Sequence, residues 1–149
     1  PGADQGERPD EQDRDDTATG RRQAAVARAA RPTEAAKEEA WADIVDRTDL
    51  PNAIMESTIG GFVQPDQVDL LRGFRDRYFA ALPGVWESRT MEMAQSITMG
   101  LYPFLLVDDE TIAATDAFLA QDLNSACRRL VNEGRDGVLR AVRAQAADA

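Results

Sequence analysis

Apolar side chains recur at helical spacing along most of the chain. From about residue 15 onward they fall every three or four residues, and no sustained alternation of apolar and polar residues indicates a strand. Asp, Asn, Thr and Pro, which favour the first positions of helices, divide this pattern into segments. The sequence therefore predicts seven helices, over approximately residues 17–30, 33–46, 51–63, 65–82, 83–101, 109–120 and 124–146.

The apolar stripe is clearest in the fourth predicted helix, which begins at Pro65. One side of this helix carries only large apolar or aromatic residues, and charged residues occupy the other sides, as expected for a helix packed on a core. Pro83 is taken as the start of the next helix. The core stripe of the fourth helix comprises Val68, Leu71, Phe74, Tyr78, Phe79 and Leu82.

Short connections between consecutive helices favour antiparallel α-hairpins that pack side by side. Such hairpins form either a compact bundle or a curved array of the HEAT or armadillo type. The predicted helix starts are irregularly spaced and share no repeated consensus, which argues against a strict repeat protein. The predicted fold is all-α: an irregular, HEAT-like or armadillo-like stack of antiparallel hairpins with about seven helices.

Residues 1–14 differ from the rest because they contain two prolines and no large apolar side chain. A segment of this composition cannot bury enough apolar surface to offset the entropy of ordering. We expect residues 1–14 to form a flexible acidic lead-in and residues 15–149 to form one helical domain, which suits a chain of 149 residues.

The formal net charge of -10 disfavours two classes of partner. Nucleic acids and anionic membranes bind clustered positive charge, so neither is expected to bind. Five arginines in the last helix offer a mildly basic face to an acidic neighbour, although a solvated helix surface is the preferred interpretation. The chain lacks an apolar stretch long enough to span a membrane, begins with acidic residues and has a single cysteine, so the expected location is cytoplasmic.

The chain contains no histidine, which narrows the chemistry available to it. Ser-His and Cys-His catalysis, histidine zinc sites and the helical Glu-x-x-His di-iron motif are all excluded. Asp108, Asp109 and Glu110 offer oxygen ligands for a hard cation, but acidic residues at a helix start are explained by capping and the helix dipole. Cys127 lies on an apolar stripe and is expected to be a buried thiol. We predict no catalytic, cofactor-binding or metal-binding residue in this chain.

Aromatic residues near proline-flanked turns are the candidates for contacts with a partner. Exposed aromatic side chains often anchor protein interfaces, although most aromatic residues belong to cores. Trp86, Tyr102 and Phe104 are the predicted interface residues.

Four segments of the sequence resemble the C-terminal helical domain of bacterial aminopeptidase N, a family of gluzincin zinc metallopeptidases. The resemblance extends from about Asp16 to Ala147, and residues 1–14 depart from it because the family continues an apolar-striped helix there. The segments are ARPTEAAKEEAWADIVDRTDLPNAIMESTIGGFVQPDQ, DRYFAALPGVWESRTMEMAQSITMGLYP, LVDDETIAATDAFLA and NSACRRLVNEGRDGVLRAVRAQ.

This resemblance implies a role without catalysis for the chain itself. In the family, an upstream thermolysin-like hydrolase domain holds zinc through a His-Glu-x-x-His motif and binds the free amino end through Gly-x-Met-x-Asn; neither motif occurs in this chain. The family's C-terminal helices close over that domain and wall an internal chamber. The implied partners are therefore the upstream catalytic domain and the peptides in the shared chamber, and zinc is expected only in the parent enzyme.

Two other functions stay open at this stage. A free-standing α-helical scaffold that binds another protein is the principal alternative. An enzyme that uses carboxylates or an oxygen-ligated cation at Asp108 and Asp109 is the third. The three hypotheses differ in what they require upstream of residue 1 and in their response to divalent metals.

Overall fold

The structure is a computed structural model that describes the backbone of residues 9–149 and the side chains from Asp16 onward. Every regular element in this part of the chain is helical. Longer helices are joined in places by short 3-10 or π turns, labelled η. The elements are α1 (Pro9–Ala29), α2 (Glu34–Trp41), η1 (Ala42–Asp46), α3 (Asn52–Phe62), η2 (Pro65–Gln67), α4 (Val68–Leu71), η3 (Arg72–Phe74), α5 (Arg75–Ser88), α6 (Met91–Leu101), α7 (Asp109–Leu119) and α8 (Ser125–Asp148).

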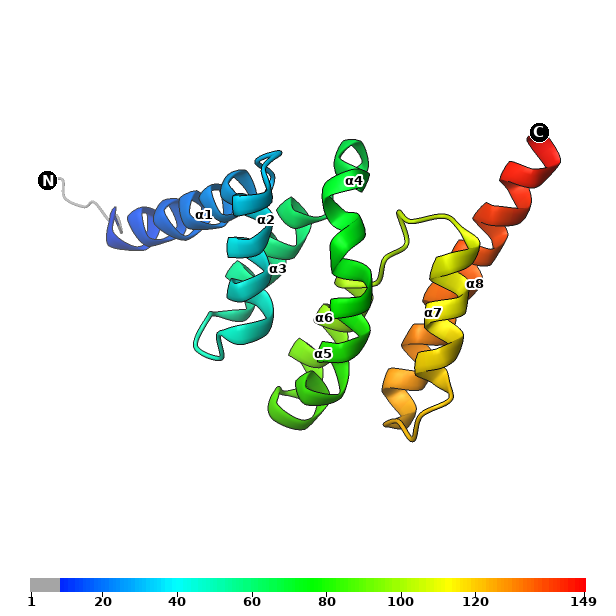
Figure 1. The fold of residues 1–149 in the computed structure, drawn as a ribbon. Helices are drawn as coiled ribbons and strands as arrows, with labels where there is room; N and C mark the ends of the chain where they lie inside the picture. Colours follow the sequence, from blue (N-terminus) through cyan, green and yellow to red (C-terminus); the bar gives the residue numbers. More distant parts are fainter. Residues whose placement is uncertain (1–8) are drawn as a thin grey trace, which may run out of the picture.

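The helices form two layers built from antiparallel hairpins (Figure 1). Helix α2 pairs with α3, α5 with α6, and α7 with α8, so each hairpin contributes one helix to each layer. Contacts between α2 and α4 and between α5 and α7 hold the first layer together, while α3, α6 and α8 pack in sequence in the second. Helix α1 extends the second layer by packing on α3. The predicted all-α stack is confirmed.

When each helix is counted together with the short turns that continue it, the described residues form seven helical segments. This is the number that the sequence predicts. Side-chain caps mark the starts as expected. Thr33 accepts a hydrogen bond from the Ala36 backbone N–H, Asp108 from that of Thr111, and Asn124 from those of Ala126 and Cys127. These bonds satisfy backbone donors that have no partner within the helix.

The predicted boundary at Pro83 is wrong, because Pro83 lies inside α5. Leu82 and Val85 on either side of the proline are buried, so core packing carries the helix through it. The break instead falls at Thr90, whose hydroxyl accepts a hydrogen bond from the Met93 backbone N–H and begins α6. The sequence prediction did not include a helix start at Thr90.

Helix α1 begins at Pro9, whereas the sequence predicted a start near Thr17. Proline suits the first turn of a helix, and the acidic residues that follow favour the positive end of the helix dipole. Of the predicted lead-in over residues 1–14, residues 1–8 lie outside the described residues, and residues 9–14 have helical backbone.

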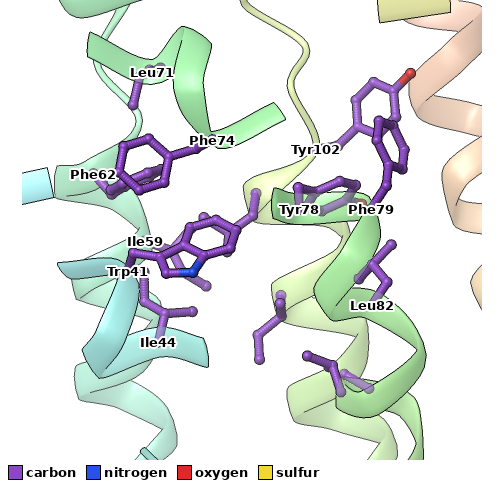
Figure 2. Packing of buried hydrophobic residues seen from close by; sticks show 14 of the residues in the cluster. Trp41, Ile44, Ile59, Phe62, Leu71, Phe74, Tyr78, Phe79, Leu82 and Tyr102 are labelled. Atoms are coloured by element: carbon purple, nitrogen blue, oxygen red, sulfur yellow. The ribbon is translucent and has the colours of Figure 1, made fainter. Parts of the chain in front are cut away.

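Aromatic side chains form the centre of the core (Figure 2). Trp41, Phe62 and Phe74 from α2, α3 and η3 make one group, with ring centroids 5.1–6.1 Å apart. Phe79 and Tyr102, with Tyr78 and Phe118, make a second group that joins α5, α6 and α7. The stripe predicted for the fourth helix therefore lies in the core, apart from the partly buried Val68.

Candidate docking surfaces

The three aromatic residues predicted to contact a partner occupy different environments. Phe104 is 45% exposed in the connection between α6 and α7. Trp86 is half-buried, and its indole N–H donates to the Thr98 hydroxyl at 2.9 Å. Tyr102 is only 4% exposed and belongs to the second aromatic group, because its ring packs against α8 and its hydroxyl bonds to Thr115 at 2.7 Å. Tyr102 is thus a core residue, and interface roles for Phe104 and Trp86 stay predictions.

The carboxylates of Asp108 and Glu110, two of the three candidate cation ligands, pair with arginines. Asp108 caps α7 and lies 3.3 Å from the Arg72 guanidinium and 3.6 Å from that of Arg75, while Glu110 lies 3.3 Å from Arg75. Although desolvation opposes it, hydrogen bonds from Thr111 and the two arginines hold the pKa of Asp108 below its usual value. Among the residues with described side chains, no cluster of potential ligands suits a metal ion. This group joins the α5 hairpin to the α7 hairpin.

The arginines of the last helix are mostly used within the domain. Arg128 donates to the carbonyls of Leu119 and Gln121 at 2.6 and 2.7 Å, which closes the C-terminal end of α7. Arg135 donates to Asp116 at 2.6 Å, and Arg129 pairs with Glu133. Two of the five arginines therefore pair with carboxylates of the domain, and Arg128 is bound by backbone carbonyls.

Lys37, the single lysine of the chain, is fully buried at the junction of α1, α2 and α3. Its ammonium group donates to the carbonyl of Ala29 at 2.7 Å and to that of Phe62 at 3.1 Å, so it caps the C-terminal ends of two helices. Desolvation lowers the pKa of Lys37, and the carboxylate of Asp66 opposes this shift. No local signal in the sequence indicated this capping role.

Cys127 is a buried thiol, as predicted. Its side chain is 2% exposed, and desolvation raises its pKa to about 11, which keeps it protonated and unreactive near neutral pH. No helix in the described part of the chain is long and apolar enough to cross a bilayer.

A groove of about 590 Å³ runs between α1 and the start of α3. Half-buried Leu50 and Ile54 lie along it, and three arginines line it on the α1 side. Among described side chains, no carboxylate forms an ion pair with these arginines. This surface was not predicted from the sequence, although the spacing of the three arginines on an alanine-rich helix is a possible signal. The arginines are Arg21, Arg22 and Arg28.

The described part of the chain is an all-helical domain built from antiparallel hairpins. Residues 6–140 match the family described as ERAP1-like C-terminal domain, and the chain belongs to this family. It is 58% identical over 140 residues to Aminopeptidase N of Streptomyces lividans. That match covers 93% of this chain and 16% of the relative, so the chain spans about one sixth of the length of the relative. The chain is thus a C-terminal domain of the aminopeptidase N type and not the catalytic domain.

Proposed function

We propose that this chain is the closing domain of a zinc-dependent aminopeptidase, which releases N-terminal residues from peptides. The catalytic domain lies upstream in the same polypeptide, and the helical stack covers it and limits which peptides enter. The observation that carries this proposal is the 58% identity to Aminopeptidase N of Streptomyces lividans over 93% of the chain. At this level of identity over almost the whole domain, a shared architectural role is the simplest explanation.

The donor groups of the chain support the assignment of zinc to the parent's catalytic domain. Zinc in proteins is held by histidine, cysteine and carboxylate ligands. The chain has no histidine, its one cysteine is buried, and the carboxylates of Asp108 and Glu110 are paired with arginines. When bound upstream, zinc supplies an activated water for peptide hydrolysis. The contribution proposed for this chain is to cover the catalytic domain and to limit which peptides reach it.

A closing domain must move or dock as a rigid unit, and polar contacts between hairpins support such rigidity. Asn52 and Glu56 of α3 bond to Glu92 and Ser96 of α6, each at 3.0 Å. The Arg89 guanidinium donates to the carbonyl of Val45 in η1 and to that of Arg47 directly after η1, and thereby ties the second hairpin to the first. With the arginine–carboxylate group at residues 108–110, these contacts link every neighbouring pair of hairpins. The two-layer stack also supports the proposed likeness to HEAT arrays, which offer a broad surface.

The net charge of -10 is compatible with peptide substrates. Negative potential attracts free α-amino groups over about 10 Å at moderate salt, and higher salt screens the effect. A cytoplasmic location is part of this proposal.

The first test is to sequence the coding DNA upstream of the Pro1 codon. His-Glu-x-x-His and Gly-x-Met-x-Asn motifs in the same frame would establish the parent as a zinc aminopeptidase. A start codon directly before Pro1 would contradict the proposal and favour a free-standing helical scaffold. Exposed Met91, Met99 and Phe104, which are 62%, 60% and 45% exposed, are the surface features that such a scaffold would use.

The gating role needs a test on the complete enzyme. Arg75→Met removes the contacts to Asp108 and Glu110 and should loosen the α5 and α7 hairpins. We expect kcat/KM for a single-residue anilide to stay unchanged, whereas kcat/KM for peptides longer than about ten residues should change severalfold. Arg129→Ala, which removes only an exposed pair, is the matched control. Equal changes for short and long substrates would contradict the gating role.

A further inference from the structure

The four methionines of the chain lie at very different depths. Met91 and Met99, both in α6, are 62% and 60% exposed, the largest exposures among the large hydrophobic side chains of the described residues. Met93 of the same helix is half-buried and packs against the core, and Met55 of α3 is 0% exposed. One short helix therefore presents two thioethers to solvent, while the other two are partly or fully covered.

The geometry of α6 explains these differences in exposure. Ala94, Ile97 and Leu101 are buried and mark the packed side of the helix. Successive residues of an α-helix are rotated by about 100°, because one turn takes 3.6 residues. Met99, five residues after Ala94, therefore lies about 140° around the helix from it and faces away from the core. Met93 lies about 100° from Ala94 in the other direction, at the edge of the packed side.

The backbone around the two exposed methionines is held by contacts that do not use their side chains. Met91 is the first residue of α6. Thr98, directly before Met99, accepts hydrogen bonds from the Trp86 indole at its hydroxyl and from the Tyr78 hydroxyl at its carbonyl, at 2.9 and 2.7 Å. A chemical change confined to the exposed thioethers should therefore leave the packing of α6 intact.

We propose that Met91 and Met99 are sites of reversible oxidation by peroxides. The two-electron step moves one oxygen atom from the peroxide to the thioether sulfur: the O–O bond breaks, an S–O bond forms, and hydrogen peroxide leaves as water. A methionine sulfoxide reductase reverses the step, because it passes two electrons and two protons from a dithiol to the sulfoxide, releases the oxygen as water and leaves a disulfide. This chemistry does not involve the catalytic domain and goes beyond the proposed function.

Burial opposes the same reaction at the other methionines. A sulfoxide at Met55 would place a polar oxygen in the core, where it loses its hydration, and close packing keeps peroxide from the sulfur. At Met91 and Met99, water reaches the sulfur before the reaction and solvates the sulfoxide oxygen after it. Oxidation at these two positions thus converts the most exposed large apolar side chains of the described residues into polar ones while the fold persists.

The test is an oxidation time course on the complete polypeptide that contains this chain. Dilute hydrogen peroxide is added to the folded protein, and peptide mass spectrometry measures the fraction of sulfoxide at each methionine. Met91, Met93 and Met99 share one tryptic peptide, because no lysine or arginine lies between Arg89 and Arg128, so fragmentation spectra are needed to separate them. The same reaction in denaturant gives the rate of each methionine without protection by structure.

We expect Met91 and Met99 to oxidise at least about tenfold faster than Met55 in the folded protein, with Met93 at an intermediate rate. In denaturant, all four rates should agree within about twofold. Reductases for both sulfoxide epimers, supplied with a dithiol, should return Met91 and Met99 to their unoxidised mass without unfolding. The matched variant Met91→Leu with Met99→Leu keeps the apolar surface and should lose the fast phase of oxidation.

Three results would overturn the proposal. The first is oxidation of Met91 and Met99 no faster than that of Met55 in the folded polypeptide. The second is sulfoxide at these two positions that the reductases remove only in denaturant. The third is oxidation of Met55 that accelerates once Met91 and Met99 have reacted, because the modification would then open the domain.

Discussion

Helices α1 and α8 are the two longest helices, with 21 and 24 residues, and lie at opposite ends of the stack (Figure 1), but they are attached differently. From residue 16 onward, α1 buries only Ala25 and Ala29. Helix α8 buries larger side chains, Leu130, Val131 and Val138 among them. The backbone of α1 instead comes close to α3 at Gly61, and its C-terminal carbonyl is held by Lys37. One end of the domain is therefore held by close backbone approach and polar capping, and the other by apolar side chains.

Replacement of Lys37 should produce the largest effect of the changes that test this comparison. Lys37→Met leaves the carbonyls of Ala29 and Phe62 without their buried donor, and each unsatisfied group costs about 1–3 kcal/mol. Removal of the buried charge offsets part of this, so we expect the free energy of unfolding to fall by about 3 kcal/mol. Chemical denaturation measures the loss, and hydrogen exchange should show that α1 loses protection first.

Glu39→Met is the matched control for Lys37→Met, because Glu39 lies on the exposed side of the same helix. Its effect should stay within about 0.5 kcal/mol. If Lys37→Met were as stable as the unmodified domain, polar capping would not be what holds the α1 end.

Gly61→Ala tests the close approach between α1 and α3. A Cβ atom at this position would lie 2.3 Å from the Val26 carbonyl oxygen and 2.9 Å from the Ala29 Cβ, so the helices must separate. We expect a loss of about 2–3 kcal/mol, within the range for overpacking, together with faster hydrogen exchange in α1.

The neighbouring glycine provides the control for Gly61→Ala. Gly60→Ala adds a Cβ with no atom within 4 Å and should stabilise the domain by about 0.5–1 kcal/mol through improved helix propensity. Equal effects of the two substitutions would show that α1 does not pack as closely as the structure places it.

Local signals in the sequence predicted the elements well because they act within a few residues. The caps at Thr33, Asp108 and Asn124 and the apolar stripe of the fourth helix depend on spacing alone, and all were confirmed. Pro83 misled the prediction because burial of its neighbours outweighed its local preference.

The candidate site was less accessible to sequence analysis, since it depends on which helices meet. The capping role of Lys37 requires the ends of α1 and α3 to converge on one point. The arginine-lined groove likewise requires α1 to lie beside Pro51 and Ile54. Tyr102, predicted at an interface, is buried because α8 brings Gly134 against its ring.

Alkaline pH should reveal the apolar burial at the α8 end. Burial raises the pKa of the Cys127 thiol from 9.0 to about 11, so the unfolded chain releases this proton at lower pH than the folded domain. The contribution of this shift to the free energy of unfolding is fully present below pH 9 and is lost as the pH rises toward 11. Integration of this shift gives a loss of about 2–3 kcal/mol.

The unfolding free energy of Cys127→Ala, measured against pH and compared with that of the unmodified domain, separates the contribution of the thiol from those of other groups. Tyr102, whose pKa burial also raises, is common to both proteins. Burial is also the main cause of the raised pKa of Tyr78, and the charge of Cys127 adds to it. The difference between the two unfolding free energies should therefore narrow between pH 9 and 11. A constant difference would mean that the thiol is not shielded as its 2% exposure indicates.

Gly134→Ala should give the smallest loss and sharpen the contrast between the two ends. A Cβ at Gly134 would lie 2.8–2.9 Å from the ring of Tyr102, so this buried side chain must shift to make room. We expect a loss of about 1–2 kcal/mol, smaller than at Gly61, where backbone blocks the new atom. Gly137→Ala, which meets only the flexible end of Arg140 at 4.0 Å, should instead stabilise the domain by about 0.5–1 kcal/mol. Because Tyr102 lies in the central core, Gly134→Ala should lower the global unfolding free energy without selectively exposing α1 to hydrogen exchange. Selective loss of protection in α1 would contradict the separate attachment of the two ends.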